Sequence, residues 1–339
     1  MKKTIVLLGV GSTYFTRGIV ESLIAKGGEW DVRLVDIDET CLEIATLLTQ
    51  RLVDLYEAPV TITGSLDRTE VLPGADAVVS TIGVGGRRAW EKDVTIFRRF
   101  NIYQSTGDTY GAGGVSRALR TIPVILALAG DMSAACPDAW LVNYTNPSGI
   151  LAEALGKHSR ARFIGLCSGP KMWSEAVFER MGVESARACV DWVGLNHLGF
   201  AVRVWVDGHD VTEQAVEAVA EHWSVDAGWL RTLGAIPATY LRYYYHHPSV
   251  VREAGEPGHR TRGEQVKEIE AQLLRQYADP DLADRPSLLA KRGGGGYAAV
   301  AFAAMRAVAR NTGERQIVQV LNRGAVDGIP ADAFRLRWM

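Results

Sequence analysis

A short apolar segment that runs into two closely spaced glycines and then into a helical pattern constrains this fold more than any other feature. Thr4–Leu8 is predicted as a buried strand, Gly9 and Gly11 form the turn, and a helix is expected over about Thr16–Ala25. Glycines here let the backbone approach a pyrophosphate, and the helix N-terminus offers N–H groups without intrahelical partners. Tyr14 replaces the third glycine of the usual dinucleotide fingerprint.

An acidic residue follows the second predicted strand, Val32–Val35. Asp36 stands where a carboxylate can bind the ribose hydroxyls of NAD+, and it would repel the 2′-phosphate of NADP+. Together with Gly9, Gly11 and Ser12 it forms a predicted NAD+ site. The alternative is an ordinary glycine turn followed by a helix-capping aspartate.

Further apolar segments alternate with helical patterns through the first half of the chain, including Ala75–Ile82, Trp140–Asn143 and Phe163–Leu166. Uninterrupted apolar strands fit a parallel sheet that helices cover on both faces. After about residue 170 the pattern becomes mixed, with a turn at Asp207-Gly208 and an apolar helix over 297–309 that is expected to be buried. We therefore predict an α/β protein: a Rossmann-like doubly wound parallel sheet in residues 1–168 and a second α+β substrate and metal domain in residues 169–339.

Composition argues against two classes of partner. Lys and Arg total 37 against 39 Asp and Glu, and this net charge of −2 does not suit a nucleic-acid surface. No continuous apolar run approaches the ~18 residues of a membrane helix, and Ile5–Val10 is too short for a signal peptide. We expect a cytoplasmic protein with no membrane partner. The four cysteines contain no CxxC pair, so reduced thiols are expected.

Polar residues follow several predicted strands. Asn146, within residues 143–149, lies past a strand's carboxyl end, where its amide can bind sugar hydroxyls or a nicotinamide. Cys167 and His197 each end an apolar strand, and a thiolate plus an imidazole suit a divalent transition metal with open positions. The simpler alternatives are that Asn146 belongs to an ordinary Asn-Pro turn, that Cys167 is a buried core cysteine, and that His197 is a hydrogen-bonded histidine without a metal. In the aromatic segment 236–247, a tyrosine beside a metal and an arginine could act as a base.

Taken together and in this order, these motifs resemble glycoside hydrolase family 4, the NAD- and metal-dependent glycosidases, and most of all its 6-phospho-β-glucosidase group. The resemblance covers essentially the whole chain. It rests on the first glycine turn and on these further segments: Gly107-Asp108-Thr109, Gly111-Ala112-Gly113-Gly114, residues 118–123, Asn146-Pro147, Gly165-Leu166-Cys167, residues 194–197, residues 240–244 and Lys291-Arg292-Gly293-Gly294. It implies a fold related to lactate and malate dehydrogenases.

The resemblance also implies a mechanism that differs from the two-carboxylate route of most glycosidases. NAD+ takes a hydride from C3 of the sugar, a base removes the C2 proton, the aglycone leaves from C1, water adds, and the hydride returns. Cys167 and His197 would hold Mn2+ or another divalent metal, and Tyr240 would be the base. The residues expected to bind the substrate are Asn146, Arg88 and Arg242.

Three features depart from the family pattern. Ser168 stands where much of the family has Asp or Asn, which leaves the general acid unassigned. The register of Arg87 and Arg88 differs from the phosphate-binding pattern, so the glycoside substrate is expected with or without a 6-phosphate. The chain ends soon after Pro330, before family chains usually end, so we expect C-terminal truncation and an incomplete second domain.

Two other functions remain open from the sequence alone. One is an NAD-dependent 2-hydroxyacid dehydrogenase of related fold, and the other is a catalytically silent, truncated NAD-binding protein. In each case we expect a homodimer or homotetramer.

Overall fold

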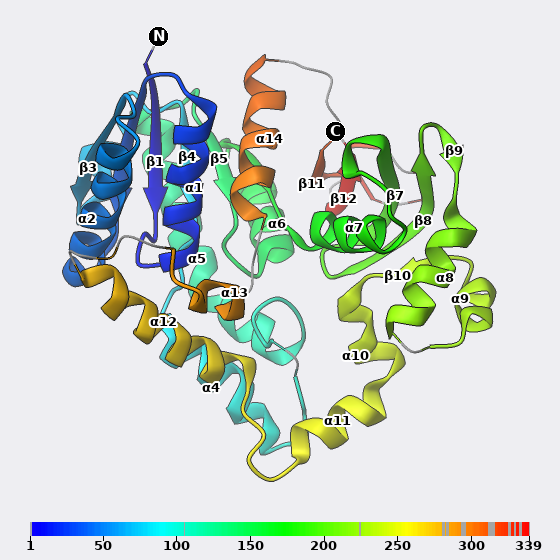
Figure 1. Cartoon of the computed structure of the whole chain (residues 1–339). Coiled ribbons are helices and arrows are strands. Elements are labelled where there is room, and N and C mark those ends of the chain that lie inside the picture. Colours follow the sequence, from blue (N-terminus) through cyan, green and yellow to red (C-terminus); the bar gives the residue numbers. More distant parts are fainter. Residues whose placement is uncertain are drawn as a thin grey trace.

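The structure, a computed structural model, contains two sheets (Figure 1) and describes residues 2–104, 106–223, 225–279, 282, 285–292, 296–310, 316–324, 327–328, 330–331 and 334–338. The larger sheet has eight strands in the order β12-β11-β6-β5-β4-β1-β2-β3. These strands are β1 (Lys3–Leu8), β2 (Trp30–Val35), β3 (Val60–Ser65), β4 (Ala77–Ser80), β5 (Trp140–Asn143), β6 (Arg162–Gly165), β11 (Ile317–Leu321) and β12 (Phe334–Trp338).

Strands β1 to β6 are all parallel and have the order 3-2-1-4-5-6 of two mononucleotide-binding halves. Alternate residues of a strand face opposite sides. Ile5 and Leu7 accordingly pack in one core cluster and Val6 and Leu8 in another, and all four are buried. Coverage of both faces explains the uninterrupted apolar pattern and confirms the doubly wound sheet.

Helices cover the two faces in separate groups. On the face of Ile5 lie α1 (Thr13–Lys26), α2 (Glu39–Leu55) and α14 (Tyr297–Arg310). On the face of Val6 lie α3 (Arg68–Val71), α5 (Gly111–Ala135) and α6 (Ser148–His158). The predicted apolar helix over 297–309 is therefore buried along one side, against α1 (Figure 1).

Among the described residues, α5 is the one helix long and apolar enough to cross a membrane. The continuous apolar runs of the sequence, taken alone, predict no such helix. Its residues Ile125, Leu128 and Met132 are buried in the core beneath the sheet. It also packs between α4 (Gly86–Arg98) and α6. Packing inside this domain thus accounts for the apolar residues on the buried side of the helix, whereas Val115 and Leu119 are exposed.

The second sheet contains β7 (Ala188–Leu195), β8 (Leu198–Val206), β9 (His209–Asp210) and β10 (Ile236–Pro237). The turn predicted at Asp207-Gly208 is present, with both residues at positive φ. The helical elements around this sheet are α7 (Gly169–Arg180), η1 (Ser185–Arg187), α8 (Thr212–Trp223), α9 (Ala227–Leu233), η2 (Thr239–Leu241), α10 (Arg242–Tyr245) and α11 (His247–Gly255).

Later segments of the chain return to the first domain. Helix α12 (Arg262–Ala278) packs on α2 and α4, and α13 (Leu288–Arg292) packs on α12 (Figure 1). Strand β11 pairs antiparallel with β6 through Gln319 and Gly165. The boundary after residue 168 remains a prediction, but residues from beyond it complete the larger sheet. The segment Gly293-Gly294 of the predicted family motif lies outside the described residues.

Candidate active site

The turn after β1 has the geometry of a dinucleotide-binding loop. Gly9 has φ +84°, and a Cβ there would lie 2.9 Å from the backbone of Ile82, so only glycine fits. Asp36 accepts a hydrogen bond from the Gly11 N–H at 2.8 Å and another from the Asp38 N–H at 3.1 Å. The carboxylate predicted to bind ribose is thus held against the loop predicted to bind the pyrophosphate.

Ser12 occupies the N-cap position of α1, but its hydroxyl makes no capping hydrogen bond. Its Oγ is buried and has no partner among the described residues. A buried hydroxyl without a partner at a helix N-terminus is a position that a phosphate oxygen would satisfy. These residues therefore fit a dinucleotide.

Tyr14, in place of the third fingerprint glycine, packs against a separate apolar cluster. This cluster contains Leu48 of α2 together with Leu273 and Tyr277 of α12. The tyrosine ties α1 to α12, which explains why a large side chain stands at that position.

Cys167 and His197 come together as predicted from the ends of their strands. Cys167 follows β6, and His197 lies in the two-residue turn between β7 and β8 with φ +61°, which is uncommon for a residue other than glycine. The Cys167 Sγ and His197 Nε2 atoms are 3.6 Å apart. One divalent ion could contact both atoms, because metal–sulfur and metal–nitrogen bonds of about 2.3 and 2.1 Å together exceed this separation.

The pair leaves open positions on an ion. Within the described ranges, no group of three or more His, Cys, Asp or Glu side chains is placed to hold a metal. The Gly169 N–H points at the Cys167 sulfur at 3.3 Å, which suits a thiolate. The donor set therefore fits a divalent metal with two protein ligands and room for substrate oxygens.

Asp108 is a residue whose role the sequence motifs did not reveal, although it lies in the Gly107-Asp108-Thr109 segment. Its carboxylate accepts hydrogen bonds from Asn146 Nδ2 at 3.0 Å and from the Thr109 hydroxyl at 2.9 Å. The local sequence carries no signal that singles it out, because aspartate beside glycine is common in ordinary turns. Asn146 is thereby oriented where it was predicted, at the carboxyl edge of the sheet.

Burial and Asp108 together set the protonation of the metal pair. Burial raises the pKa of the Cys167 thiol to about 11, the Gly169 N–H opposes this, and the charge of Asp108 adds to it. Burial lowers the pKa of His197 to about 4, and the charge of Asp108 opposes that shift. In the metal-free site both ligands are therefore neutral at pH 7, and metal binding would release the thiol proton.

Tyr240 on η2 lies flat against the imidazole of His197, with ring centroids 3.9 Å apart and planes at 12°. Burial raises the pKa of the Tyr240 phenol well above its ordinary range, and negative charge on Cys167, when it is a thiolate, and on Asp108 raises it further. The phenol therefore holds its proton until positive charge arrives nearby.

Arg262, which the sequence did not single out, lies close enough to Tyr240 for a charge on one to affect the pKa of the other. Burial and nearby Arg292 lower the pKa of Arg262, whereas Tyr240 raises it. Its Nη2 donates to the carbonyl of Arg292 at 2.6 Å. Arg242 instead pairs with Glu253 at 3.1 Å on the surface.

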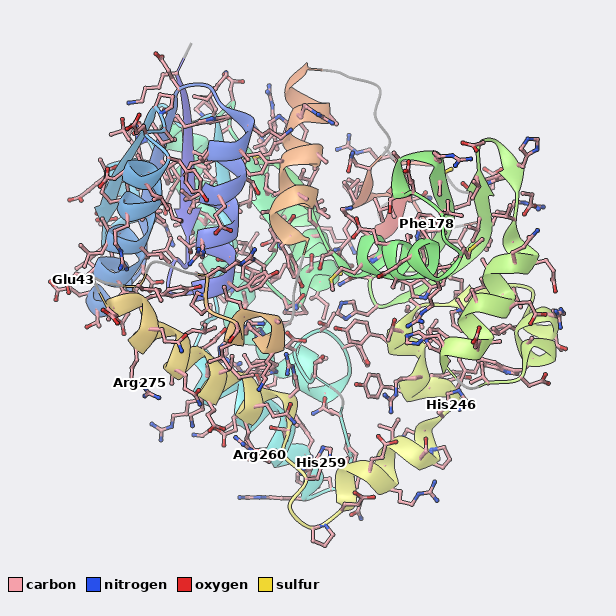
Figure 2. All side chains as sticks on the ribbon, viewed as in Figure 1. Glu43, Phe178, His246, His259, Arg260 and Arg275 are labelled. Atoms are coloured by element: carbon pink, nitrogen blue, oxygen red, sulfur yellow. The ribbon has the colours of Figure 1, made fainter. Side chains whose placement is uncertain are left out.

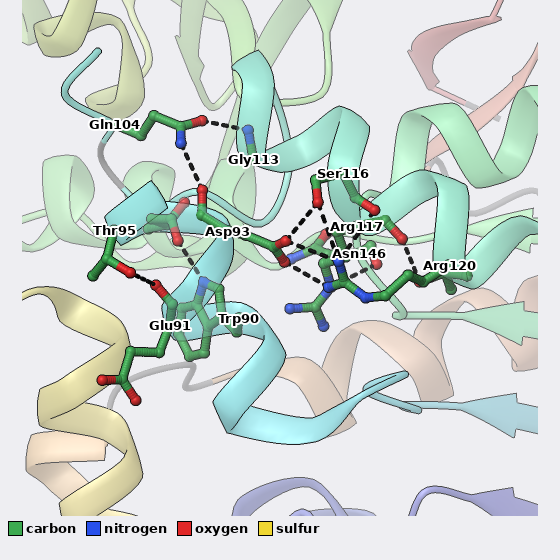
Figure 3. A network of polar contacts seen from close by, with 12 residues as sticks. Trp90, Glu91, Asp93, Thr95, Gln104, Gly113, Ser116, Arg117, Arg120 and Asn146 are labelled. Atoms are coloured by element: carbon green, nitrogen blue, oxygen red, sulfur yellow. Dashed lines mark hydrogen bonds and ion pairs between the residues drawn. The ribbon is translucent and has the colours of Figure 1, made fainter. Parts of the chain in front are cut away.

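A polar network fixes the helix that supports Asn146 (Figure 3). Asp93 of α4 is buried and accepts hydrogen bonds from Ser116 at 2.8 Å and from Arg120 at 2.8 and 2.6 Å. Arg117 donates to the Asn146 carbonyl at 3.1 Å. The first turn of α5 packs closely on neighbouring backbone, because a Cβ on Gly113 would lie 2.7 Å from two carbonyl oxygens. This packing explains the glycine-rich start of α5.

The two neighbouring arginines of α4 differ in environment. Arg87 binds the carboxylate of Glu270 with two nitrogens, and Glu270 also accepts from Arg292 at 2.7 Å. Arg88 is exposed. The assignments of Arg88 and Arg242 to the substrate therefore stay predictions.

Comparison with known proteins gives matches along nearly the whole chain. The model for "Family 4 glycosyl hydrolase" matches residues 4–183, and that for "Family 4 glycosyl hydrolase C-terminal domain" matches residues 192–334. A probable 6-phospho-beta-glucosidase of Bacillus subtilis is 36% identical over 97% of this chain and 78% of its own length.

Solved structures agree with these matches. The 6-phospho-beta glucosidase of Thermotoga maritima, solved with manganese, NAD+ and glucose-6-phosphate, superposes with a TM-score of 0.87 at 26% identity, covering 99% of this chain and 80% of its own. Malate dehydrogenase of Cryptosporidium parvum, at 14% identity and a TM-score of 0.60, covers 100% of this chain and 87% of its own and shares the fold.

Proposed function

The chain belongs to glycosyl hydrolase family 4 and is a glycosidase, and from this premise we propose that it hydrolyses 6-phospho-β-glucosides with NAD+ and Mn2+ as cofactors. The observation that carries the proposal is the Cys167–His197 pair at 3.6 Å, covered by the stacked ring of Tyr240. This pair lies at the same sheet edge as the loop of Gly9 and Asp36. A relative that covers almost all of this chain binds manganese, NAD+ and glucose-6-phosphate.

The residues divide the chemistry between them. When bound, NAD+ accepts and returns a hydride, and the divalent ion polarises oxygens of the sugar. Tyr240 removes the C2 proton, and the positive charge of a bound divalent ion, with that of Arg262, would favour the phenolate that this requires. Asn146, oriented by Asp108, holds a sugar hydroxyl through its amide. Ser168 is buried, and its hydroxyl cannot supply a proton as a carboxylic acid would.

Guanidinium groups suit a 6-phosphate, because they bind phosphate through charge-assisted and often bidentate hydrogen bonds. Three arginine side chains lie around the single carboxylate of Glu270: Arg87, Arg262 and Arg292. This excess of positive charge supports a phosphorylated substrate. Arg88, on the same helix as Arg87, keeps its predicted role in this proposal.

The test compares 4-nitrophenyl β-glucosides with and without a 6-phosphate, in NAD+ and Mn2+. We expect turnover of the phosphorylated compound, no net NADH, and deuterium at C2 of the product in D2O. Tyr240→Phe should lower kcat by about 10²–10⁴-fold. Net NADH formation would point instead to a dehydrogenase, and a product without solvent hydrogen at C2 would exclude the elimination route.

A homodimer or homotetramer and a cytoplasmic location belong to the same proposal. Large apolar side chains are exposed on the surface of α5 and of the β7–β8 hairpin: Val115, Leu119, Leu195 and Leu198. Grouped apolar exposure of this kind is typical of protein interfaces. Sedimentation velocity should show a species of two or four chains, and a monomer at all concentrations would contradict this part.

A further inference from the structure

A hollow of about 290 Å³ lies between α9 and α10, on the second domain. It is lined by Val225, Asp226, Trp229, Tyr245 and His246. Figure 2 shows His246 where α10 meets α11, away from the larger sheet. None of these residues takes part in the proposed NAD+, metal or catalytic sites.

The aromatic wall of the hollow is held rigidly. Trp229 is half-buried and packs against the apolar core of the second domain. The rings of Trp229 and Tyr245 meet edge to face, with centroids 5.2 Å apart and planes at 77°, and the His246 ring lies 5.7 Å from that of Trp229. A fixed indole beside a second ring offers a platform that loses little side-chain entropy on binding.

The hollow contains a hydrogen-bond acceptor and a side chain that can donate a hydrogen bond. Asp226 is exposed and caps α9 by accepting from the Gly228 N–H at 3.0 Å, and no donor within the described part of the chain binds its second carboxylate oxygen. His246 is exposed and can donate or accept through its ring. An aromatic face combined with a carboxylate and an imidazole matches a sugar ring, which has apolar C–H faces and a rim of hydroxyls.

Size and ring geometry narrow the choice of ligand. A volume of about 290 Å³ is at the small end for ligand pockets, so it suits one pyranose ring. The edge-to-face contact of Trp229 and Tyr245 leaves no gap in which the two rings could enclose an organic cation, and a cation on a single ring face is the alternative that the binding test separates from a sugar. We propose that the Trp229–Tyr245–Asp226–His246 hollow is a second carbohydrate-binding site that takes a single pyranose.

The pyranose has two possible sources, a free sugar or the aglycone sugar of a longer substrate. Tyr240 precedes this site along the chain by only a few residues, and its ring lies 6.4 Å from that of Tyr243 on α10. The segment that carries the proposed base therefore leads directly into the wall of the second site.

The binding test uses the full chain labelled with 5-fluorotryptophan. The chain has nine tryptophans, and the Trp229 signal is assigned by its loss in Trp229→Phe. Titration with methyl β-D-glucopyranoside should shift the Trp229 fluorine resonance saturably. No shift of that resonance, or a shift with tetramethylammonium and not with the sugar, overturns the proposal.

The matched variants are Asp226→Asn and Asp67→Asn. Asp67 caps α3 in the same way, accepting from the Thr69 N–H at 2.8 Å, and lies outside the hollow. Asparagine caps helices as well as aspartate does, so both variants should fold. We expect Asp226→Asn to weaken sugar binding at least severalfold and Asp67→Asn to leave it unchanged, and equal affinities in the two variants contradict the assignment.

Kinetics separate the two sources of sugar. A higher KM of Asp226→Asn for a phosphorylated disaccharide, with an unchanged KM for the aryl glycoside, identifies the aglycone sugar as the ligand. An unchanged KM for both substrates identifies a free sugar. Only this comparison rests on the proposed function, because the fluorine titration does not require activity.

Discussion

Removal of the Asp93 carboxylate should destabilise the first domain much more than removal of a comparable carboxylate on the surface. The Asp93 side chain is 3% exposed and accepts three hydrogen bonds, two of them from the Arg120 guanidinium. Breaking a buried charge pair costs about 3–5 kcal/mol, because the remaining charge is left without a partner. The Arg120 side chain is 30% exposed and can regain some water. We therefore expect Asp93→Ala to lower the free energy of unfolding by about 2–4 kcal/mol.

Asp131→Ala is the matched control. Asp131 lies on α5 and pairs with Arg68, but these side chains are 34% and 29% exposed. An ion pair with this much solvent contact contributes about 0–1 kcal/mol. Both variants act on the same domain, so urea unfolding followed by circular dichroism compares them directly.

A third variant identifies the cause of the loss. Arg120→Ala in the Asp93→Ala background removes the stranded guanidinium and should recover part of the stability. Two results would refute this explanation. One is that Asp93→Ala lowers the free energy of unfolding no more than Asp131→Ala does, and the other is that the loss in the double variant equals the sum of the losses in the two single variants. The kcat of Asp93→Ala should also fall, since the network supports the helix that contacts Asn146.

Four further outcomes are expected. Gly113→Ala should destabilise the fold by about 1–3 kcal/mol, because its Cβ would meet two carbonyl oxygens at 2.7 Å, whereas Gly130→Ala on the same helix, with open space around it, should be neutral or stabilising in the same urea experiment. Asp36→Ala should weaken NAD+ binding by about 1–3 kcal/mol in calorimetry, and an unchanged affinity would remove this carboxylate from the site. His197→Ala should weaken Mn2+ binding by more than about tenfold in equilibrium dialysis, and wild-type affinity would show that the ion binds elsewhere. Burial, with a contribution from neighbouring carboxylates, raises the pKa of the Cys41 thiol to about 11. The rate of Cys41 alkylation by iodoacetamide should therefore reach half its maximum near that pH, and a midpoint in the ordinary thiol range would contradict this.

Much of the site could be predicted because, in this fold, the end of each parallel strand determines where the residue that follows it lies. The carboxyl ends of parallel strands share one edge of a sheet. A glycine turn after β1, an aspartate after β2 and a cysteine after β6 are therefore gathered by any chain that forms this sheet. His197 is different, because it lies in the β7–β8 turn of the second sheet, and its approach to 3.6 Å from Cys167 depends on how that sheet packs against the larger one.

The rest depended on contacts that no local pattern encodes. Asp108 reaches Asn146 because its loop packs on two glycines of α5, and Arg262 comes within electrostatic range of Tyr240 because α12 returns across the first domain. The capping box of Thr261 and Glu264 marks where α12 begins, but not what it packs against. The placement of β11 beside β6 likewise could not be predicted, since a five-residue strand carries no information about its partner.

The pairing of β11 with β6 has a consequence for how the chain is made. Synthesis on the ribosome proceeds from the N-terminus, and domains generally fold as they emerge. Strand β6 is complete at Gly165, but its neighbour begins only at Ile317. For roughly 150 residues of translation, β6 is therefore the open edge of an unfinished sheet and can attract foreign strands. The nascent chain must protect that edge, with a chaperone or with its own emerging second domain, until its last strands arrive.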